Sequence, residues 1–491
     1  SVMKRFVSVV LATGMSVMFL TSCGKSPEVG SYSYEQIMAK FNGEPERNVT
    51  IKVLENDIAV DEGYFGDLIA AFNAEYAEYG IKAEDANMSQ YTDLEKNGPL
   101  GYGPDVLYDA NDKIMRYAEN GHVLPLPTER LDVYGAGNLE ATVSDSYKMN
   151  KYGMDLQFGV PINVQTLVMY YLEDTFKGEA DTNKNAVPDV LETYNALYAY
   201  SKEIRKGSTN DNRVFGYVQS LNNEYFNFGY LLSYGAYIFG DSTSDIGLAA
   251  GESYKGLQVM QSLASIMDSD ASGDSYTVQA YSGLASGKYR ATITTPDVYV
   301  KFYNSLVDKY VKTDKMARED AEKKAAENLK VSDVPRLPRS GDLGEVITDI
   351  DSQTFAATMM GGINGYAISS YTKNPKASLL FIDFASRYEQ VVARASKLGV
   401  VPARKDAAAA ENTNAYSEMV YKRIEEGRVT IMPSVRDLSY VWSSVSSMFA
   451  LVADDVTVKG NGSPKDYNTA DSLKALLVKA VDDIKKVMQI S

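Results

Sequence analysis

The chain has 491 residues, which is long for one ordinary domain and indicates two or more folded units. Hydrophobic residues make up 45% of it, with 36 Tyr and 16 Phe, so it has ample apolar surface for globular cores and is not a disordered protein. The formal charge of -16 argues against nucleic acid as a partner, because phosphates require basic patches, and it disfavours a strongly anionic ligand.

The first residues have the pattern of a bacterial lipoprotein signal. Lys4 and Arg5 are followed by an apolar run over residues 6–20, which is too short for a membrane span, and then by Leu-Thr-Ser-Cys-Gly. We therefore expect residues 1–22 to be a signal peptide and Cys23 to be lipidated, which would anchor the protein at the extracytoplasmic face of the cell membrane. The alternative is a buried N-terminal helix with a stray cysteine. Ser1 and Val2 precede Met3, so the translation start stays open.

Residues 23–48 are polar, and we expect a lipid-anchored tether with one short helix near 34–41. The folded body is expected to begin at Val49 with a strand over 49–54. A helix over 64–79 follows, because apolar residues recur there at helical spacing, and a second strand is expected over 81–85.

The stretch 103–127 combines a strand, a polar loop and a helix. The strand begins at Asp105, the polar residues 109–113 form what we call the crest, and a helix runs to Asn120-Gly121. In an open α/β sheet, ligands bind at the carboxyl ends of the strands. We therefore expect Asn111, Asp112 and Lys113 to have side chains free for a neutral polar ligand; an ordinary capped loop is the alternative. The β-α-β-α-β order predicts a parallel doubly wound sheet.

Two extended, glycine-marked segments, at 158–164 and 361–368, lie about 200 residues apart. They indicate an α/β protein with two discontinuous lobes joined by hinge crossings. The N-terminal lobe is expected over 49–161 plus about 365–412, and the C-terminal lobe over 162–364 plus about 413–491. Strands are expected over 167–171 and 291–294. Helices are expected over residues 190–206, 254–267, 280–286, 314–329, 375–384, 430–447 and 470–488.

Four sequence blocks carry a resemblance to a known family. They are GPDVLYDANDKIMRYAENGHVLPL, YGMDLQFGVPINVQTLVMYY, GGINGYAISSYTKNPKASLLFIDF and IMPSVRDLSYVWSSVSSMF. Their order resembles that of the bacterial extracellular solute-binding proteins (family 1) of carbohydrate ABC importers, and among them the maltose/maltodextrin-binding lipoproteins. The resemblance extends from about Val49 to Ile490.

This resemblance implies a two-lobe periplasmic-binding-protein-like fold (type II) whose lobes close over a neutral oligosaccharide. Maltose or maltodextrin is the favoured sugar, and ABC transporter permease subunits would be the protein partners. The protein would be a monomer, would not be an enzyme and would require no cofactor.

The resemblance also implies site residues. The first-lobe contacts fall on Asp61 and Asp112, whose carboxylates can accept sugar hydroxyl hydrogen bonds. Tyr225 matches a stacking tyrosine of the second lobe, and Trp442, the only tryptophan, matches a platform tryptophan. Flat rings suit the apolar face of a sugar ring. From composition alone, both rings could equally belong to the core.

At three further ligand-contact positions the chain departs from the family. Glu62, Lys113 and Gln165 stand where the family often has lysine, arginine and glutamate, and they keep hydrogen-bonding capacity. Asp109 and Asp297 replace residues that are often aromatic, which removes at least one stacking surface. Another neutral oligosaccharide therefore stays open as the ligand.

Residues 181–192 have the oxygen pattern of an EF-hand-type calcium loop. Positions one, three, five, seven, nine and twelve would supply the ligands Asp181, Asn183, Asn185, the Val187 carbonyl, Asp189 and Glu192. Position six is Ala186, where such a loop favours glycine. A structural calcium ion and a polar turn without an ion both fit this sequence.

Enzymatic function has little support in the sequence. Cys23 belongs to the lipidation signal, His122 is the only histidine, and neither a serine-nucleophile motif nor a phosphate-binding loop is present. A lipid-anchored glycosidase or lyase that uses two carboxylates stays as one alternative. A receptor of the same fold for a different sugar or a peptide is another.

Overall fold

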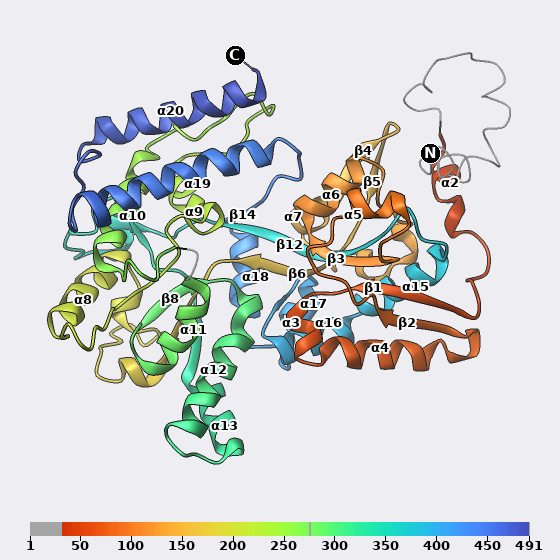
Figure 1. Cartoon of the computed structure of the whole chain (residues 1–491), viewed down its shortest axis with the longest axis horizontal. Helices are drawn as coiled ribbons and strands as arrows, with labels where there is room; N and C mark the ends of the chain where they lie inside the picture. Colours follow the sequence, from red (N-terminus) through yellow and green to blue (C-terminus); the bar gives the residue numbers. More distant parts are fainter. Residues whose placement is uncertain (1–31, 274–275, 491) are drawn as a thin grey trace. The chain divides into compact units, whose positions relative to one another are not determined.

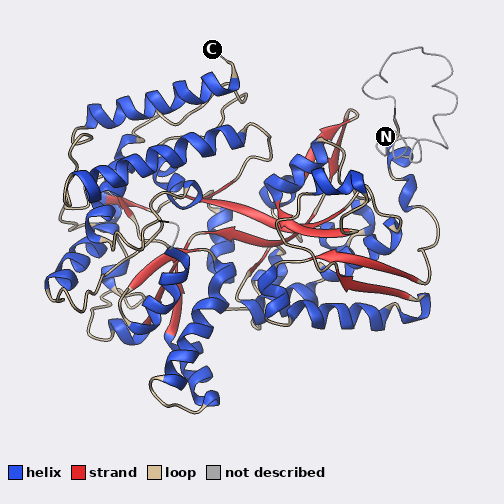
Figure 2. Ribbon diagram, in the orientation of Figure 1, coloured by secondary structure: helices blue, strands red, loops and turns tan. Residues whose placement is uncertain are grey.

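A computed structural model describes residues 32–273 and 276–490 (Figure 1, Figure 2). The signal sequence and Cys23 lie outside the described residues, so lipidation stays a prediction. Within the described part of the chain, no helix is long and apolar enough to cross a membrane.

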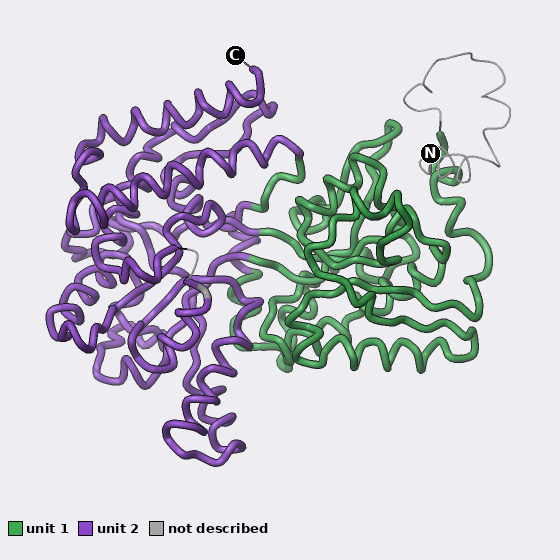
Figure 3. The backbone as a smooth tube through the Cα atoms, viewed as in Figure 1, with its two compact units in different colours: residues 1–165, 362–421, 431–435 green, residues 166–361, 422–430, 436–491 purple. Residues whose placement is uncertain are grey.

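The chain divides into two compact units, shown in different colours in Figure 3. Unit 1 takes residues up to 165 together with 362–421 and 431–435, and unit 2 takes 166–361, 422–430 and 436–491. The sequence analysis placed everything after about 412 in the second lobe. Hydrogen bonds explain why the segment that follows stays with unit 1: the Tyr416 hydroxyl donates to the Gly399 carbonyl, and the Tyr421 hydroxyl accepts from the Glu140 N–H at 3.1 Å.

Unit 1 is built on a mixed sheet whose strand order is β13-β6-β12-β3-β1-β2. Strands β1 (Val49–Leu54), β2 (Ile81–Asp85) and β3 (Val106–Ala110) are parallel, as expected. The later strand β12 (Met359–Ile368) pairs antiparallel with β3, and β13 (Val401–Pro402) pairs antiparallel with β6 (Val160–Thr166). The expectation of a purely parallel sheet is therefore wrong. The order of the first three strands does not indicate that β12, some 250 residues later, pairs with β3 in the antiparallel direction.

Helices cover this sheet through their apolar faces. Helix α4 (Tyr64–Glu75) buries Phe65, Leu68 and Phe72, the residues whose spacing predicted it. Phe72 packs edge-on against Phe381 of α15 (Pro375–Ala385), with ring centroids 5.2 Å apart. The other elements of unit 1 are α2 (Tyr34–Ile37), η1 (Ala39–Phe41), α3 (Asp57–Asp61), η2 (Ala77–Tyr79), α5 (Leu94–Asn97), η3 (Gly98–Leu100), α6 (Asn111–Glu119), η4 (Thr128–Arg130), η5 (Asp132–Tyr134), α7 (Ala141–Asp145), β4 (Lys148–Lys151), β5 (Met154–Gln157), α16 (Tyr388–Leu398) and α17 (Lys405–Ala408).

The C-terminal half of the expected tether is part of the folded body. Phe41 is only 1% exposed, and its carbonyl accepts a hydrogen bond of 2.6 Å from Arg130 Nη1. Glu46 Oε1 accepts from the N–H groups of Lys376 and Ala377, at the start of α15. A carboxylate at a helix N-terminus is favourable because it meets unsatisfied N–H groups. Folded structure therefore begins well before Val49.

Unit 2 has its own antiparallel sheet of order β8-β7-β9, formed by β8 (Ala291–Thr294), β7 (Val168–Leu172) and β9 (Leu329–Ser332). The other elements of unit 2 are η6 (Glu173–Phe176), η7 (Asp189–Leu191), α8 (Tyr194–Lys206), α9 (Glu224–Ser233), α10 (Tyr254–Ile266), α11 (Tyr276–Ser286), η8 (Pro296–Val298), α12 (Tyr299–Lys312), α13 (Arg318–Asn328), β10 (Leu337–Pro338), α14 (Ile350–Gln353), β11 (Thr354–Phe355), α19 (Leu438–Asp454), the π-helix η9 (Asp455–Lys459) and α20 (Ala470–Met488). Two further elements, α18 (Ser417–Glu425) and β14 (Val429–Ile431), lie where the chain changes unit.

Several expected helix limits are wrong. The helix expected to begin at 430 begins at Leu438, because residues 429–431 form strand β14. The helix expected over 314–329 is α13, which begins at Arg318 and gives way at Leu329 to strand β9. Helices α9, α12 and α16 were not predicted. The apolar residues of α9 and α12 include several tyrosines, which are weak markers of a helical face because they favour strands as well.

Candidate functional site

Lys113 is held by a neighbouring carboxylate on the crest of unit 1. Its Nζ lies 3.1 Å from Asp109 Oδ2, one helical turn away, and both side chains are 23% exposed. Burial lowers the pKa of Lys113, but the charge of Asp109, the Tyr117 hydroxyl and the hydrogen bond to Asp109 together outweigh it, so the pKa rises. The expectation of a free Lys113 is therefore wrong. The amine can still donate its remaining hydrogens to a ligand.

Asn111, the first residue of α6, is fully buried and fully hydrogen-bonded. Its Nδ2 donates to the Met432 carbonyl at 3.1 Å and to Ser434 Oγ at 2.8 Å, while its Oδ1 accepts from the Ile363 N–H at 3.1 Å. The prediction that this side chain is free for a ligand is wrong. Asn111 instead joins the crest to β12 and to the 431–435 segment, and so it fixes the position of the residues beside it.

Asp112 is the half-buried carboxylate at the start of α6. Burial, and after it the negative charge of Asp109, raise the pKa of the Asp112 carboxyl above its ordinary value. The first turn of a helix favours an anion, but here that effect is smaller than the cost of desolvation. Hydroxyl donors from a ligand would therefore stabilise the ionised form.

The loop after β1 holds the next two predicted residues. Asp61 ends the short helix α3 and is exposed, and Glu62 follows it half-buried. Asn56 Oδ1 caps this helix by accepting from the N–H groups of Ile58 and Ala59. The loop thus has a defined shape at the carboxyl end of β1.

Tyr91 was missed by the sequence analysis. Its neighbour Gln90 accepts a hydrogen bond of 3.0 Å from the Asp57 N–H at the start of α3, and the Tyr91 side chain is 78% exposed. The available signal was an aromatic residue in the polar stretch Ser-Gln-Tyr-Thr-Asp after β2. A large exposed ring beside Asp61's helix is a candidate stacking surface.

Gln165 is half-buried on β6, which β12 separates from β3 in the sheet order. One strand therefore lies between Gln165 and the strand that leads into the crest. Asp297 belongs to the short helix η8 of unit 2, where Thr295 Oγ1 donates to its carboxylate.

Tyr225 lies in the first turn of α9, whose position is fixed by an uncharged network of buried side chains. Asn223 caps the helix by accepting from the Phe226 N–H at 3.1 Å. Asn227 donates to the carbonyls of Ser220 and Asn223, and Gln219 Nε2 donates to Asn227 Oδ1 at 2.7 Å. Tyr225 is half-buried and packs edge-on against Phe226.

Trp442 lies on α19, which packs against α9. Its ring contacts Phe228 of α9 edge-on, with centroids 5.5 Å apart and planes at 76°. One turn further along α19, Ser446 Oγ donates to the Asn222 carbonyl at 2.9 Å, just before α9 begins. Trp442 is half-buried, so it differs from the fully buried core of α19, such as Val441 and Val445. The structure thus brings together the two helices that carry Tyr225 and Trp442.

The 181–192 loop gathers three carboxylates. Ligand oxygens of Asp181, Asp189 and Glu192 lie within 4.8 Å of one another. Ala186, at the position where a calcium loop favours glycine, has a left-handed φ of 67°. The backbone therefore makes the sharp turn that glycine would make, at some cost in strain.

Internal donors bind these carboxylates as well. Glu192 Oε1 accepts from the amides of Asn183 at 2.9 Å and Asn185 at 2.7 Å, and Asp189 accepts from the Thr182 N–H at 3.0 Å. A bound calcium ion would require the two asparagine amides to turn their oxygens inward. The ligand types fit Ca²⁺, which binds six to eight oxygens in a flexible geometry.

His122 is a buried histidine between Tyr371 and Glu95, whose Oε1 lies 3.8 Å from His122 Nε2. Its Nδ1 lies 2.7 Å from the Tyr371 hydroxyl, and its ring packs edge-on against Tyr117. Burial lowers the pKa of His122, so the ring is neutral near pH 7. These contacts are those of a core histidine.

Comparisons with known proteins agree with the fold and with the four sequence blocks. The family described as "Bacterial extracellular solute-binding protein" matches residues 67–420. Maltodextrin-binding protein MdxE of Bacillus subtilis is 23% identical over 426 residues, which cover 84% of this chain and 80% of that relative. The galactooligosaccharide-binding protein of the same organism is 23% identical over 398 residues, covering 79% and 81%.

Solved structures also share the fold. MalX from Streptococcus pneumoniae, in complex with maltopentaose, matches with a TM-score of 0.64 at 21% identity, over 89% of this chain and 100% of that one. The predicted α/β binding-protein fold is therefore confirmed. Since the family match extends over most of the chain, the protein belongs to the bacterial extracellular solute-binding proteins.

Proposed function

We propose that this protein captures a neutral maltooligosaccharide outside the cytoplasm and delivers it to the permease of an ABC transporter. Relatives named for maltodextrin and maltooligosaccharide binding support the ligand class. Lipidation at Cys23, which the sequence pattern supports, would hold the protein at the membrane surface.

The pairing of α9 with α19 carries this proposal. It presents two half-buried aromatic side chains, Tyr225 and Trp442, on helices that are joined by a ring contact and by a neutral hydrogen bond. Apolar faces of pyranose rings pack on such rings, while sugar hydroxyls need acceptors and donors. Asp61, Glu62, Asp112 and Lys113 of unit 1 would supply those, and Gln165 is a further candidate.

Titration calorimetry with maltose, maltotriose, a longer α-glucan and a galactooligosaccharide tests the ligand class. We expect binding of the α-glucans together with a change in the emission of Trp442, the only tryptophan. The galactooligosaccharide arm matters because one relative is named for that sugar. Absence of heat and of any emission change for every sugar would contradict the proposal.

The rival function is that of a glycosidase with two carboxylates. Asp109 and Asp112 are such a pair on the crest, but Asp109, at the end of β3, is held by Lys113, and Asp112 lies only three residues later in the first turn of α6. We expect maltoheptaose to stay intact after overnight incubation with the protein. Shortened products, in amounts that scale with protein concentration, would support the enzyme instead.

We further propose that the 181–192 loop binds a structural calcium ion through Asp181, Asn183, Asn185, the Val187 carbonyl, Asp189 and Glu192. The clustered carboxylates and the left-handed turn at Ala186 support this. Chelation should then lower the free energy of unfolding by about 2.7 kcal/mol if calcium was at about 100 times its Kd. The measurement is thermal unfolding with chelator, with calcium restored and with Asp189→Asn. Unchanged melting in all three would exclude the site.

A further inference from the structure

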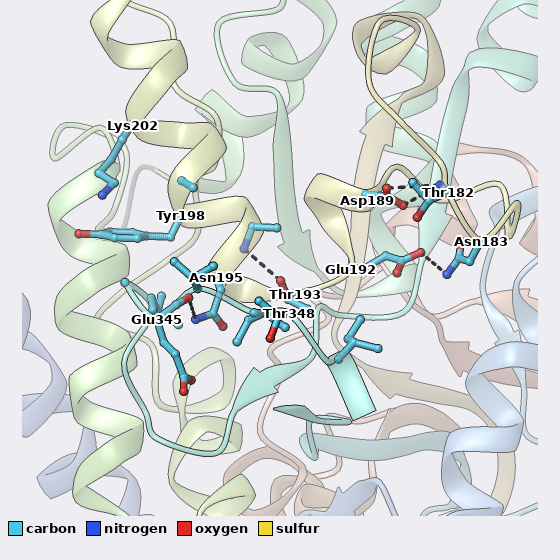
Figure 4. Close-up of a pocket in the computed structure, with 17 residues that line it drawn as sticks. Thr182, Asn183, Asp189, Glu192, Thr193, Asn195, Tyr198, Lys202, Glu345 and Thr348 are labelled. Atoms are coloured by element: carbon cyan, nitrogen blue, oxygen red, sulfur yellow. Dashed lines mark hydrogen bonds between the residues drawn. The ribbon is translucent and has the colours of Figure 1, made fainter. Parts of the chain in front are cut away.

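Unit 2 has a pocket of about 580 Å³ that the proposed sugar contacts do not use (Figure 4). We call it the α8 pocket. Its walls are residues from both ends of the 181–192 loop, the first three turns of α8, and the segment 343–350. None of its lining residues belongs to α9 or α19, so it is separate from Tyr225 and Trp442.

A buried acceptor without a partner lies in its wall. Asn195 is 5% exposed, and its Nδ2 donates to the carbonyls of Asp342 at 2.9 Å and Glu345 at 3.0 Å. Because both amide hydrogens are used, the orientation of the amide is fixed. Its Oδ1 has no hydrogen-bond partner among the described residues, and Figure 4 shows the amide between Thr193 and Glu345. A buried acceptor left in this state is costly, and a ligand donor would pair with it once the side chains that cover it move aside.

The carboxylates around the pocket already have partners, and two of them, Asp189 and Glu192, also belong to the calcium site proposed above, so a further cation in the pocket has little support. Glu192 Oε1 already accepts from two asparagine amides, Asp189 accepts from the Thr182 N–H, and Glu345 Oε2 accepts from Ser340 Oγ at 3.0 Å. Lys202 adds a positive charge at the far end, where its Nζ lies 4.4 Å from the Tyr198 ring centroid. An anionic ligand would be repelled by the carboxylates of Asp189, Glu192 and Glu345. The lining therefore favours a neutral ligand.

The rest of the lining suits a ligand with an apolar face. Val346, which is 77% exposed, and Ile347 line the wall opposite α8, and Ala196 and Ala199 line the α8 wall. A sugar ring offers an apolar face and hydroxyls that both donate and accept, so it could donate to Asn195 Oδ1 and accept from Lys202. We propose that the α8 pocket is a second carbohydrate site, for one or two sugar rings.

The wall opposite α8 is already in place without a ligand. Gln353 Nε2 donates to the Val346 carbonyl at 3.1 Å, and Gln353 Oε1 accepts from the N–H groups of Thr348 and Asp349 at 2.8 Å. Together with the two bonds from Asn195, these contacts fix the segment that carries Val346. Binding therefore requires little ordering of the loop, which lowers its entropic cost.

The test separates this pocket from the proposed sugar site by removing Trp442. In a Trp442→Ala protein, saturation-transfer NMR is recorded with glucose, galactose and maltose at millimolar concentration. A second substitution, Ala199→Tyr, fills the pocket from an exposed position of α8, and Glu203→Tyr is the matched control one turn later, outside the lining. Val346→Tyr fills the pocket from the other wall and replaces Ala199→Tyr if that variant does not fold.

We expect at least one sugar to give a signal that Glu203→Tyr preserves and that Ala199→Tyr or Val346→Tyr reduces to the protein-free level. The proposal is overturned if no sugar gives a signal, if the pocket-filling variants match the control, or if the dication cadaverine displaces the sugar. In the protein with Trp442 intact, Ala199→Tyr should leave the sugar-dependent emission unchanged. A missing emission response there would contradict the proposed function while leaving the α8 pocket result as it stands.

Discussion

The crest of unit 1 and the aromatic helices of unit 2 are both candidate ligand surfaces, but they are built in different ways. On the crest, Asp109 at the end of β3 and Asp112 and Lys113 in the first turn of α6 are charged groups whose protonation depends on one another. Around Tyr225 and Trp442, neutral amides, hydroxyls and ring edges fix the geometry. The first surface should respond to pH and charge, and the second to changes of shape.

The largest effect is expected for Trp442→Ala. Loss of a stacking ring should weaken sugar binding by about 1–3 kcal/mol in calorimetry. Tyr440→Ala, on the same helix, is the matched aromatic control and should leave affinity nearly unchanged. If Trp442 serves only the core, the melting temperature falls while the affinity of the folded protein stays the same.

Asp112→Asn should have the next largest effect. It removes a charged acceptor and should weaken binding by about 1.5 kcal/mol. The same change should leave the protein as stable or make it more stable, because burial disfavours the ionised carboxyl. Calorimetry measures the expected loss of affinity, and thermal unfolding of the same preparation measures the expected unchanged or increased stability. A parallel fall in affinity and stability would indicate a structural role instead.

The pH dependence sharpens the contrast between the two surfaces. The raised pKa of Asp112 means that its carboxyl is protonated at a higher pH than an ordinary aspartic acid, for which the usual value is 3.8. The protonated Asp112 carboxyl therefore contributes to stability. This contribution is fully present below the pKa of the unfolded state and is lost as pH rises through the pKa of the folded state. Sugar affinity should change in the opposite direction and fall as pH is lowered through the folded pKa.

Asp112→Asn should flatten this profile, measured by calorimetry across acidic pH. Trp442→Ala should lower the affinity at every pH and leave the shape of the profile unchanged. If the wild-type profile is flat over the same range, the crest carboxylate does not contact the ligand.

The smallest effect is expected for Tyr91→Ala. An exposed ring that adds one partial stacking contact should contribute about 0.5–1 kcal/mol to affinity. Stability should hardly change, since the side chain is 78% exposed. Tyr102→Ala, at a ring that is 69% exposed in the same connection, is the control. Equal affinities for the two variants would exclude Tyr91 from the site.

The sequence predicted those helices and strands that are determined by residues close together in the chain. The spacing of Phe65, Leu68 and Phe72 predicted α4, and Asn120-Gly121 marked the end of α6. The four blocks predicted the family, which the comparison over residues 67–420 confirms. The positions of the candidate ligand residues on loops and helix starts also follow from the sequence, although their contact with a sugar stays a prediction.

Long-range partners could not be predicted. Asn111 appeared free in the sequence because its partners, Ile363, Met432 and Ser434, lie more than 250 residues away. The same holds for Glu55 and Arg394, which form a fully buried ion pair at 2.8 Å between the end of β1 and α16. Burial of a charged group requires a partner, but the sequence does not say which one.

If Cys23 carries a lipid, the packing of the segment before β1 would limit how far the protein can move from the membrane. The Tyr32 ring already packs edge-on against Tyr152, with centroids 5.1 Å apart. With a lipid on Cys23, nine residue steps would join the anchor to this contact, and they span about 30 Å at most. A tether reaching to residue 48 would have spanned about 85 Å by the same measure. Such a short tether would keep the protein within a thin layer next to the membrane. It would therefore raise the effective concentration of the protein at a membrane-embedded partner.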